Sequence, residues 1–142
     1  MKYEDKSKFI GEVKTAAQEW AEGKIDALFP NKPQARALLK RGLNNWLTRE
    51  DERVNRMLDT ALLFVADERG TIDSDAVVDI VADLFKEMDV QRYQMGIVEV
   101  MAGKGEVVVS LPQNMYLDMI VGRLGTVRFT VDDLLELKEL MR

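Results

Sequence analysis

GIVEVMAGKGEVVVSLP, residues 96–112, decides the fold class of this chain. It contains two short runs rich in β-branched residues, 97–101 and 107–111, on either side of the glycine-containing loop 102–105. Two such runs separated by a short loop with glycine predict a β-hairpin. Pro112 is expected to end the second strand, because proline cannot donate to a strand ladder. The chain is therefore not expected to be all-helical.

The residues that precede the hairpin repeat their apolar side chains at helical spacing, which predicts helices. Gly23 is expected to end the first helix. Pro33 is expected to begin the second, because a proline in the first turn removes only an N–H that has no partner there. Thr48 is expected to cap the third helix, and Asp73 or Ser74 the fourth. The four predicted helices cover residues 5–22, 33–47, 48–70 and 73–88.

After the hairpin, the sequence predicts a short helix over 114–121, a short strand over 126–129 and a last helix that starts at Thr130, with Asp133 three residues later. The predicted fold class is therefore α+β and mostly helical. It consists of an N-terminal bundle of about four helices, followed by a small ββαβα unit with a β-hairpin.

The composition is that of one domain with a limited chemical repertoire. The 142 residues, 46% of them hydrophobic, fit a single domain, 1–142, with possible sub-lobes at 1–90 (helical) and 91–142 (hairpin plus helices). Cysteine and histidine are both absent, which excludes disulfides, cysteine nucleophiles and histidine-based metal sites or proton shuttles. We expect no cofactor, no metal site and no catalytic residue. The N-terminus lacks the apolar segment of a secretory signal and no window suits a membrane span, so a cytoplasmic location is expected.

Residues 32–56 carry seven basic and three acidic side chains, in a chain whose net charge is −5. Helical spacing places Trp46 with the apolar residues and away from the arginines, unlike an aromatic residue that stacks on nucleic-acid bases. Glu52 precedes Arg56 by four residues, which favours an ion pair. Two interpretations stay open: the solvated outer face of two helices, or an anion-binding surface for nucleic acid or an acidic protein. The residues of the second interpretation are Arg36, Lys40, Arg41, Arg49, Arg53 and Arg56.

Three shorter patterns that resemble chemical sites have ordinary explanations. AGKGE, residues 102–106, lacks the spacing of a phosphate-binding loop, and no helix is predicted to follow it. DERGTIDSD, residues 67–75, places Arg69 and Ile72 where a calcium loop requires a ligand and a glycine. The carboxylates at every fourth position from Asp75 are typical of a solvated helix face.

Several predicted elements carry more apolar side chains than one buried face can use. The residues outside the main apolar faces are Leu63 and Phe64 in the third helix, Ile97 and Met101 in the hairpin, and Leu137 and Leu140 in the last helix. A two-stranded hairpin would also leave an edge open to another strand. We therefore hypothesise a non-enzymatic protein-interaction or assembly protein that acts through apolar helix and strand-edge surfaces, as a homo-oligomer or with a protein partner.

The alternative hypothesis is a nucleic-acid-associated regulatory protein that uses the basic residues of 32–56. An enzyme is a third interpretation. It would require a deep pocket that gathers carboxylates from distant segments of the chain.

Overall fold

The computed structural model describes residues 2–66, 70–111, 125–133, 136 and 139. The helices are η1 (Tyr3–Asp5), α1 (Lys6–Leu28), α2 (Pro33–Arg49), α3 (Asp51–Val65) and α4 (Ser74–Glu87), and the strands are β1 (Gln91–Met95), β2 (Val98–Gly103), β3 (Glu106–Ser110) and β4 (Thr126–Thr130). The strands form one antiparallel sheet in the order β1-β2-β3-β4. The predicted class, α+β and mostly helical, is confirmed.

The first helix is longer than predicted, because Gly23 does not end it. α1 continues to Leu28, and Ile25 in this extension is fully buried. Glycine inside a helix costs about 1 kcal/mol relative to alanine, while burying an isoleucine side chain contributes about 1.5–3 kcal/mol. The burial of Ile25 therefore outweighs the helix-breaking tendency of Gly23, and only residues 29–32 connect α1 to α2.

The predicted cap at Thr48 is wrong, whereas the predicted cap at Asp73 is confirmed. Thr48 lies inside α2, where its hydroxyl donates a hydrogen bond to the Asn44 carbonyl at 3.0 Å. α2 ends at Arg49 and α3 begins at once with Asp51. Asp73 accepts a hydrogen bond from the Asp75 N–H at 3.0 Å and so caps α4.

The predicted hairpin is formed by β2 and β3, with a tighter turn than expected. Gly103 pairs with Glu106, and Lys104 and Gly105 make the turn with φ values of 51° and 83°. Positive φ at both central residues suits the twist of a two-residue hairpin. The Lys104 N–H donates to the Met88 carbonyl at 2.8 Å and the Gly105 N–H to the Phe85 carbonyl at 3.2 Å, so the turn satisfies carbonyls at the end of α4.

The predicted ββαβα unit is incomplete, because a further strand, β1, precedes the hairpin. β1 pairs with β2 from Gln91↔Ala102 to Met95↔Val98. Its sequence, QRYQM, has no β-branched residue and gave no strand signal. The predicted strand at 126–129 is present as β4, which pairs with β3. The helix predicted at 114–121 and most of the last helix lie outside the described residues.

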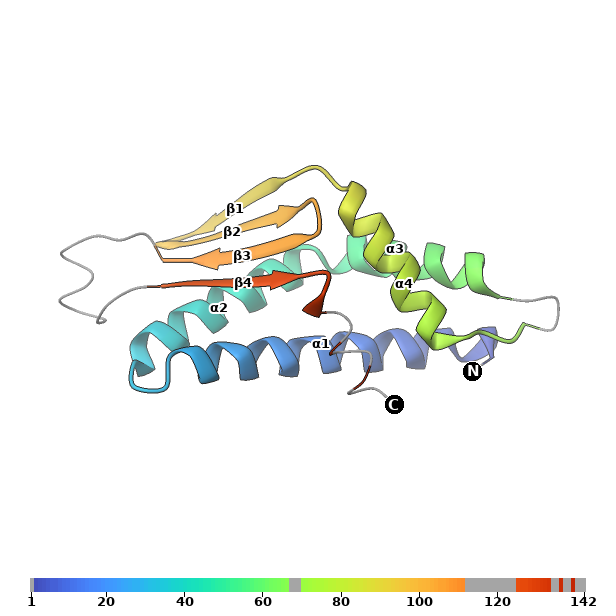
Figure 1. Cartoon of the computed structure of the whole chain (residues 1–142), viewed down its shortest axis with the longest axis horizontal. Helices are drawn as coiled ribbons and strands as arrows, with labels where there is room; N and C mark the ends of the chain where they lie inside the picture. The colour runs from blue at the N-terminus through green and yellow to red at the C-terminus, as the bar shows by residue number, and fades with distance from the viewer. Residues whose placement is uncertain (1, 67–69, 112–124, 134–135, 137–138, 140–142) are drawn as a thin grey trace.

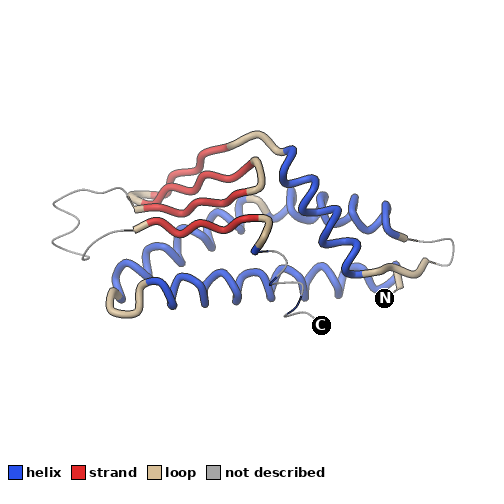
Figure 2. The backbone as a smooth tube through the Cα atoms, viewed as in Figure 1, coloured by secondary structure: helices blue, strands red, loops and turns tan. Residues whose placement is uncertain are grey.

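The helices are arranged in two groups around the sheet (Figure 1). α1 and α2 run side by side beneath one face of the sheet, and α3 and α4 lie at one end of the molecule (Figure 2). The face toward the helices carries the buried residues Val98, Val100, Val109 and Val127. α2 approaches β2 closely at Gly42, where a Cβ atom would lie 2.9 Å from the Val98 Cβ atom.

The buried apolar residues form two separate clusters. The cluster between α1, α2 and the sheet, here called the sheet core, comprises Ala21, Ile25, Ala35, Leu39, Leu43, Val98, Val100, Val109, Leu111, Val127 and Phe129. The cluster at the end with α3 and α4, here called the helical core, comprises Phe9, Ala61, Leu62, Ile72 and Val77. The first ninety residues thus supply buried side chains to the same core as the sheet.

Candidate functional site

A cavity of about 710 Å³ lies where the sheet core and the helical core meet. Its walls come from α1, α2, α3, α4, β3 and the end of β4. Trp20, Trp46 and Val107, which line it, also pack against the sheet core, whereas Val13 and Val81 pack against the helical core. The cavity therefore lies beside residues that pack against both clusters.

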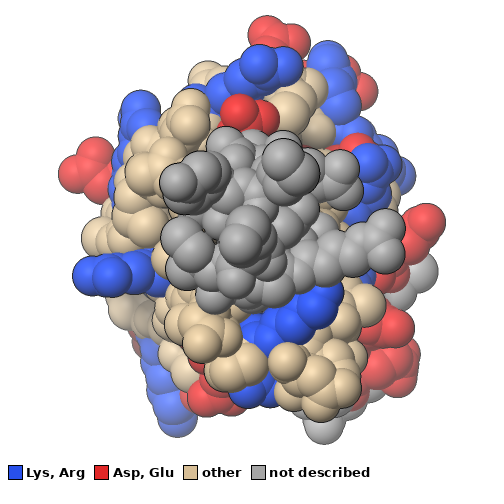
Figure 3. Space-filling model, turned by 90° about the vertical axis from the view of Figure 1, so that its left-hand side faces the viewer, with Lys and Arg blue, Asp and Glu red and all other residues tan. Residues whose placement is uncertain are grey.

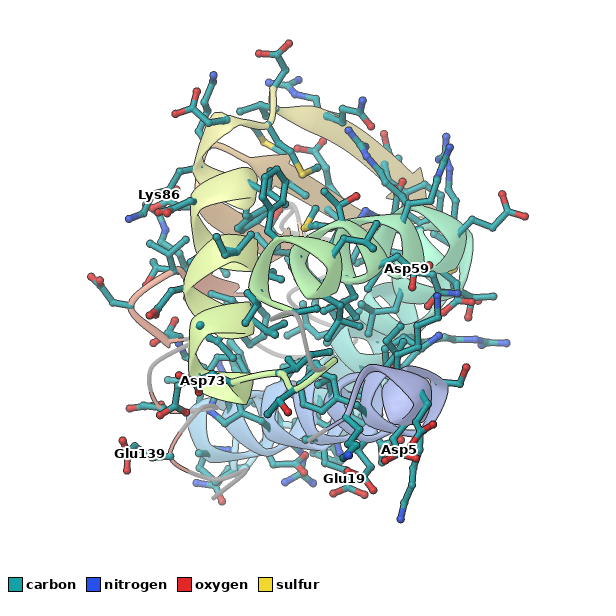
Figure 4. The ribbon with its side chains drawn as sticks, turned by 90° about the vertical axis from the view of Figure 1, so that its right-hand side faces the viewer. Asp5, Glu19, Asp59, Asp73, Lys86 and Glu139 are labelled. Atoms are coloured by element: carbon teal, nitrogen blue, oxygen red, sulfur yellow. The ribbon has the colours of Figure 1, made fainter. Side chains whose placement is uncertain are left out.

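The cavity wall is mainly apolar. The chain has two tryptophans, Trp20 on α1 and Trp46 on α2, and both line it while remaining only partly buried. Phe85 on α4 and Phe129 on β4 add aromatic rings, and the Trp20 and Phe129 ring centroids lie 5.5 Å apart. Met57 on α3 also lines the cavity. In the view from the end with α3 and α4, carbon-rich side chains lie between these helices and α1 (Figure 4).

One charged pair stands at the edge of the cavity. The Lys14 ammonium lies 2.7 Å from an Asp51 carboxylate oxygen and donates to the Asn55 side-chain oxygen at 3.0 Å. Lys14 and Asp51 both line the cavity. Since they pair with each other, they present no net charge to it.

Uncharged polar side chains near this edge also bond to one another. Asn44 donates to a Glu22 carboxylate oxygen at 2.9 Å and accepts from the Gln18 amide at 3.1 Å. Gln18 and Asn44 line the cavity. These bonds join α1 to α2.

A second charged cluster, next to Trp20 and Phe129, joins α1 to β4. The Lys24 ammonium donates to the Arg128 carbonyl at 2.8 Å and to an Asp133 oxygen at 3.1 Å, and it lies 5.7 Å from the Trp20 ring centroid. Burial raises the pKa of the Asp133 carboxyl. Hydrogen bonds from the Thr130 N–H and from Lys24, together with the charge of Lys24, outweigh this effect, so the pKa lies below its ordinary value of 3.8. Asp133 is thus held as a carboxylate, and its role is structural.

The candidate anion-binding residues do not all face solvent with free charges. The Lys40 ammonium lies 2.6 Å from an Asp26 carboxylate oxygen, and the Arg36 guanidinium lies 4.0 Å from the same oxygen. Arg53 forms an ion pair with Glu50 and donates a hydrogen bond to Gln91. The Arg49 guanidinium lies over the Tyr93 ring, and the side chains of Arg41 and Arg56 are exposed. Figure 3 shows one end of the molecule, on which Lys and Arg side chains alternate with acidic and uncharged ones. Trp46 packs against the sheet core, as predicted.

The predicted apolar interaction residues occupy different environments. Leu63 is 64% exposed and Phe64 73% exposed, both in the last turn of α3. Ile97 packs partly buried against the sheet core, because it lies in the turn before β2, where strand alternation does not yet apply. Met101 is half-buried on the sheet face opposite Val100. Leu137 and Leu140 lie outside the described residues.

The edges of the predicted hairpin are covered within the chain, since β1 pairs with β2 and β4 with β3. The outer edges of the sheet are therefore those of β1 and β4. Lys24 bonds the Arg128 carbonyl of β4.

Within the described ranges, the structure holds no cluster of three or more acidic residues arranged for a metal ion. No helix in that part of the chain has the length and apolar character needed to cross a membrane.

The sequence placed Trp20 and Trp46 on apolar helix faces but did not predict the cavity, because its wall combines six separate segments.

Comparison with known proteins places the chain in no family. No family model, no curated protein and no solved structure matches it.

Proposed function

We propose that this chain is a non-enzymatic protein-interaction or assembly protein, and that it forms a homo-oligomer through the end of α3. The observation that supports this most directly is the pair of adjacent exposed side chains Leu63 and Phe64. Aromatic residues are enriched in protein interfaces, and burying such side chains drives association. Homo-oligomers with closed symmetry are the commonest assemblies of soluble proteins.

The sequence adds a chemical argument for a binding role. Without cysteine or histidine, the chain lacks the usual nucleophile and the usual proton shuttle near neutral pH. Asp51, which lines the cavity, pairs with Lys14, and Glu22 accepts a hydrogen bond from Asn44. These pairings join helices to each other, which suits a scaffold.

The test is the mass of the protein in solution, measured by light scattering at two concentrations. The wild type is expected to have a multiple of the mass of one chain. A Leu63→Ser/Phe64→Ser double variant is expected to dissociate, with an association constant about 100-fold weaker, because two apolar contacts of the proposed interface are lost.

Leu28→Ser is the matched control, because Leu28 is 52% exposed but lies at the end of α1. It should keep the mass of the wild type. A wild type that stays monomeric at the higher concentration, or a double variant that associates as strongly as the wild type, would contradict the proposal.

The nucleic-acid alternative stays a prediction, and titration with DNA at two salt concentrations tests it. Binding through Arg41 and Arg56 and their basic neighbours should weaken steeply as salt increases, because each phosphate contact releases a counterion. The pairing of Lys40 with Asp26 and of Arg53 with Glu50 reduces the charge that this face offers.

A further inference from the structure

The cavity beside the sheet core and the helical core is a half-open apolar hollow and not an enclosed void. Ligand sites are usually clefts or cavities of this kind, whereas closed interiors contain few voids larger than a water molecule. Here, a volume of about 710 Å³ is bordered by four helices and the sheet. Cavities of roughly 300–1,000 Å³ with mainly apolar walls are typical small-molecule sites.

We propose that this cavity binds an uncharged, predominantly hydrocarbon small molecule. The aromatic rings of Trp20, Trp46, Phe85 and Phe129, which come from α1, α2, α4 and β4, would contact it from several directions. Elements on opposite sides of the cavity contribute to its wall, which suits a compact molecule better than an added helix or strand. This site is independent of the exposed residues at the end of α3.

The paired charges on the cavity wall favour an uncharged ligand. Lys14 and Asp51 neutralise each other at 2.7 Å, and Lys14 also bonds Asn55. A carboxylate ligand would have to compete with Asp51 for Lys14, and a cationic ligand would have to compete with Lys14 for Asp51. Lys14 and Asp51 are the charged residues among the described residues that line the cavity, so a charged ligand finds no unpaired opposite charge on that wall. An apolar molecule leaves the pair intact.

The site contains its own spectroscopic reporter, because both tryptophans of the chain line the cavity. The experiment is a titration of the full chain with N-phenyl-1-naphthylamine, a neutral apolar fluorophore. Binding is expected to be saturable, to increase the emission of the probe and to quench the tryptophan emission by energy transfer. Absence of saturable binding to the wild type would overturn the proposal.

Two substitutions on the same helix localise the binding. Ala17 lines the cavity, so Ala17→Phe would fill part of it and weaken probe binding by about tenfold or more, because added side-chain volume displaces the ligand. Ala27 is exposed on α1 and does not line the cavity, so Ala27→Phe should bind as the wild type does. Equal binding by the two variants would overturn the proposal.

A measurement on the wild type decides the matter if Ala17→Phe does not fold. Methyl NMR should show probe-dependent shifts at Met57 and Val81, which line the cavity, and none at the exposed Leu63 and Val90. Shifts at Leu63 and Val90 instead would overturn the proposal, because the probe would then bind an exposed surface. Loss of self-association in Ala17→Phe, together with no probe binding to the wild type, would show that a second copy fills the cavity.

Discussion

The sheet core and the helical core are stabilised in different ways. The sheet core packs two helices against four strands that are joined by backbone hydrogen bonds, and Leu39, Val109 and Val127 within it are fully buried. The helical core is smaller and joins three helices through side chains such as Phe9 and Leu62, with no strand ladder among them. A helix held by side-chain packing can shift to fill a deleted volume, whereas a strand fixed between two neighbours cannot move without breaking its ladder.

This difference should appear first in two matched deletions, Leu39→Ala in the sheet core and Leu62→Ala in the helical core. Both leucines are fully buried. Leu39→Ala is expected to lower the free energy of unfolding by about 4 kcal/mol, and Leu62→Ala by about 2.5 kcal/mol, because the cost depends on how far the surroundings collapse. Urea unfolding with comparable slopes measures both values. An equal or larger loss for Leu62→Ala would show that the two cores are equally rigid.

Two glycine substitutions sharpen the comparison at the level of helix contacts. Gly42→Ala should destabilise the protein by about 2 kcal/mol, because its Cβ would lie 2.9 Å from the Val98 Cβ where α2 meets β2. A Cβ at Gly23, also inside a helix, would have no atom within 4 Å apart from its chain neighbours and the backbone of its own helix. Gly23→Ala should therefore stabilise by about 0.5–1 kcal/mol through helix propensity. Thermal unfolding reads both, and a change of the same sign in the two variants would refute this account of Gly42.

Among the destabilising substitutions, the smallest effect is expected at the connection between α1 and β4. The folded-state pKa of Asp133 lies below its ordinary value of 3.8, so its stabilisation is fully present above that value. It is lost as the pH falls through the folded pKa. Asp133→Asn should cost about 1 kcal/mol at neutral pH, because asparagine keeps an acceptor oxygen but loses the charge that strengthens the bonds from Lys24 and the Thr130 N–H.

Unfolding of the wild type and of Asp133→Asn, measured from neutral pH downward, checks this. The difference between the two proteins should decrease below about pH 4, because protonated Asp133 resembles asparagine in charge. A difference that stays constant into strong acid would mean that the charge of Asp133 has no part in it.

Local signals in the sequence predicted much of the fold. Pro33 begins α2 and Asp73 caps α4, because both act on backbone groups of their own turn. The β-branched runs formed β2 and β3. Where a distant contact decides, the local signal failed. Gly23 lies inside α1 because Ile25 is buried, and β1 forms because β2 offers it a partner.

The candidate sites show the same difference between local sequence signals and contacts of distant residues. Leu63 and Phe64 could be identified from helical spacing, since exposure on a helix depends on position around its axis, and both are exposed. The cavity could not be identified in this way, because helical spacing shows only that Trp20 and Trp46 lie on apolar faces. Whether those faces meet or leave a space depends on how the helices are placed relative to the sheet.

The continuation of α1 past Gly23 has a consequence for cooperativity. The same helix supplies Phe9 to the helical core and Ala21 and Ile25 to the sheet core. At 1.5 Å per residue it extends over about 35 Å, so one hydrogen-bonded rod passes beside the cavity and through both clusters. If either cluster opens, α1 must unwind from that end toward the other cluster. Amide protons in the middle of α1 should therefore exchange with solvent only when both clusters open together.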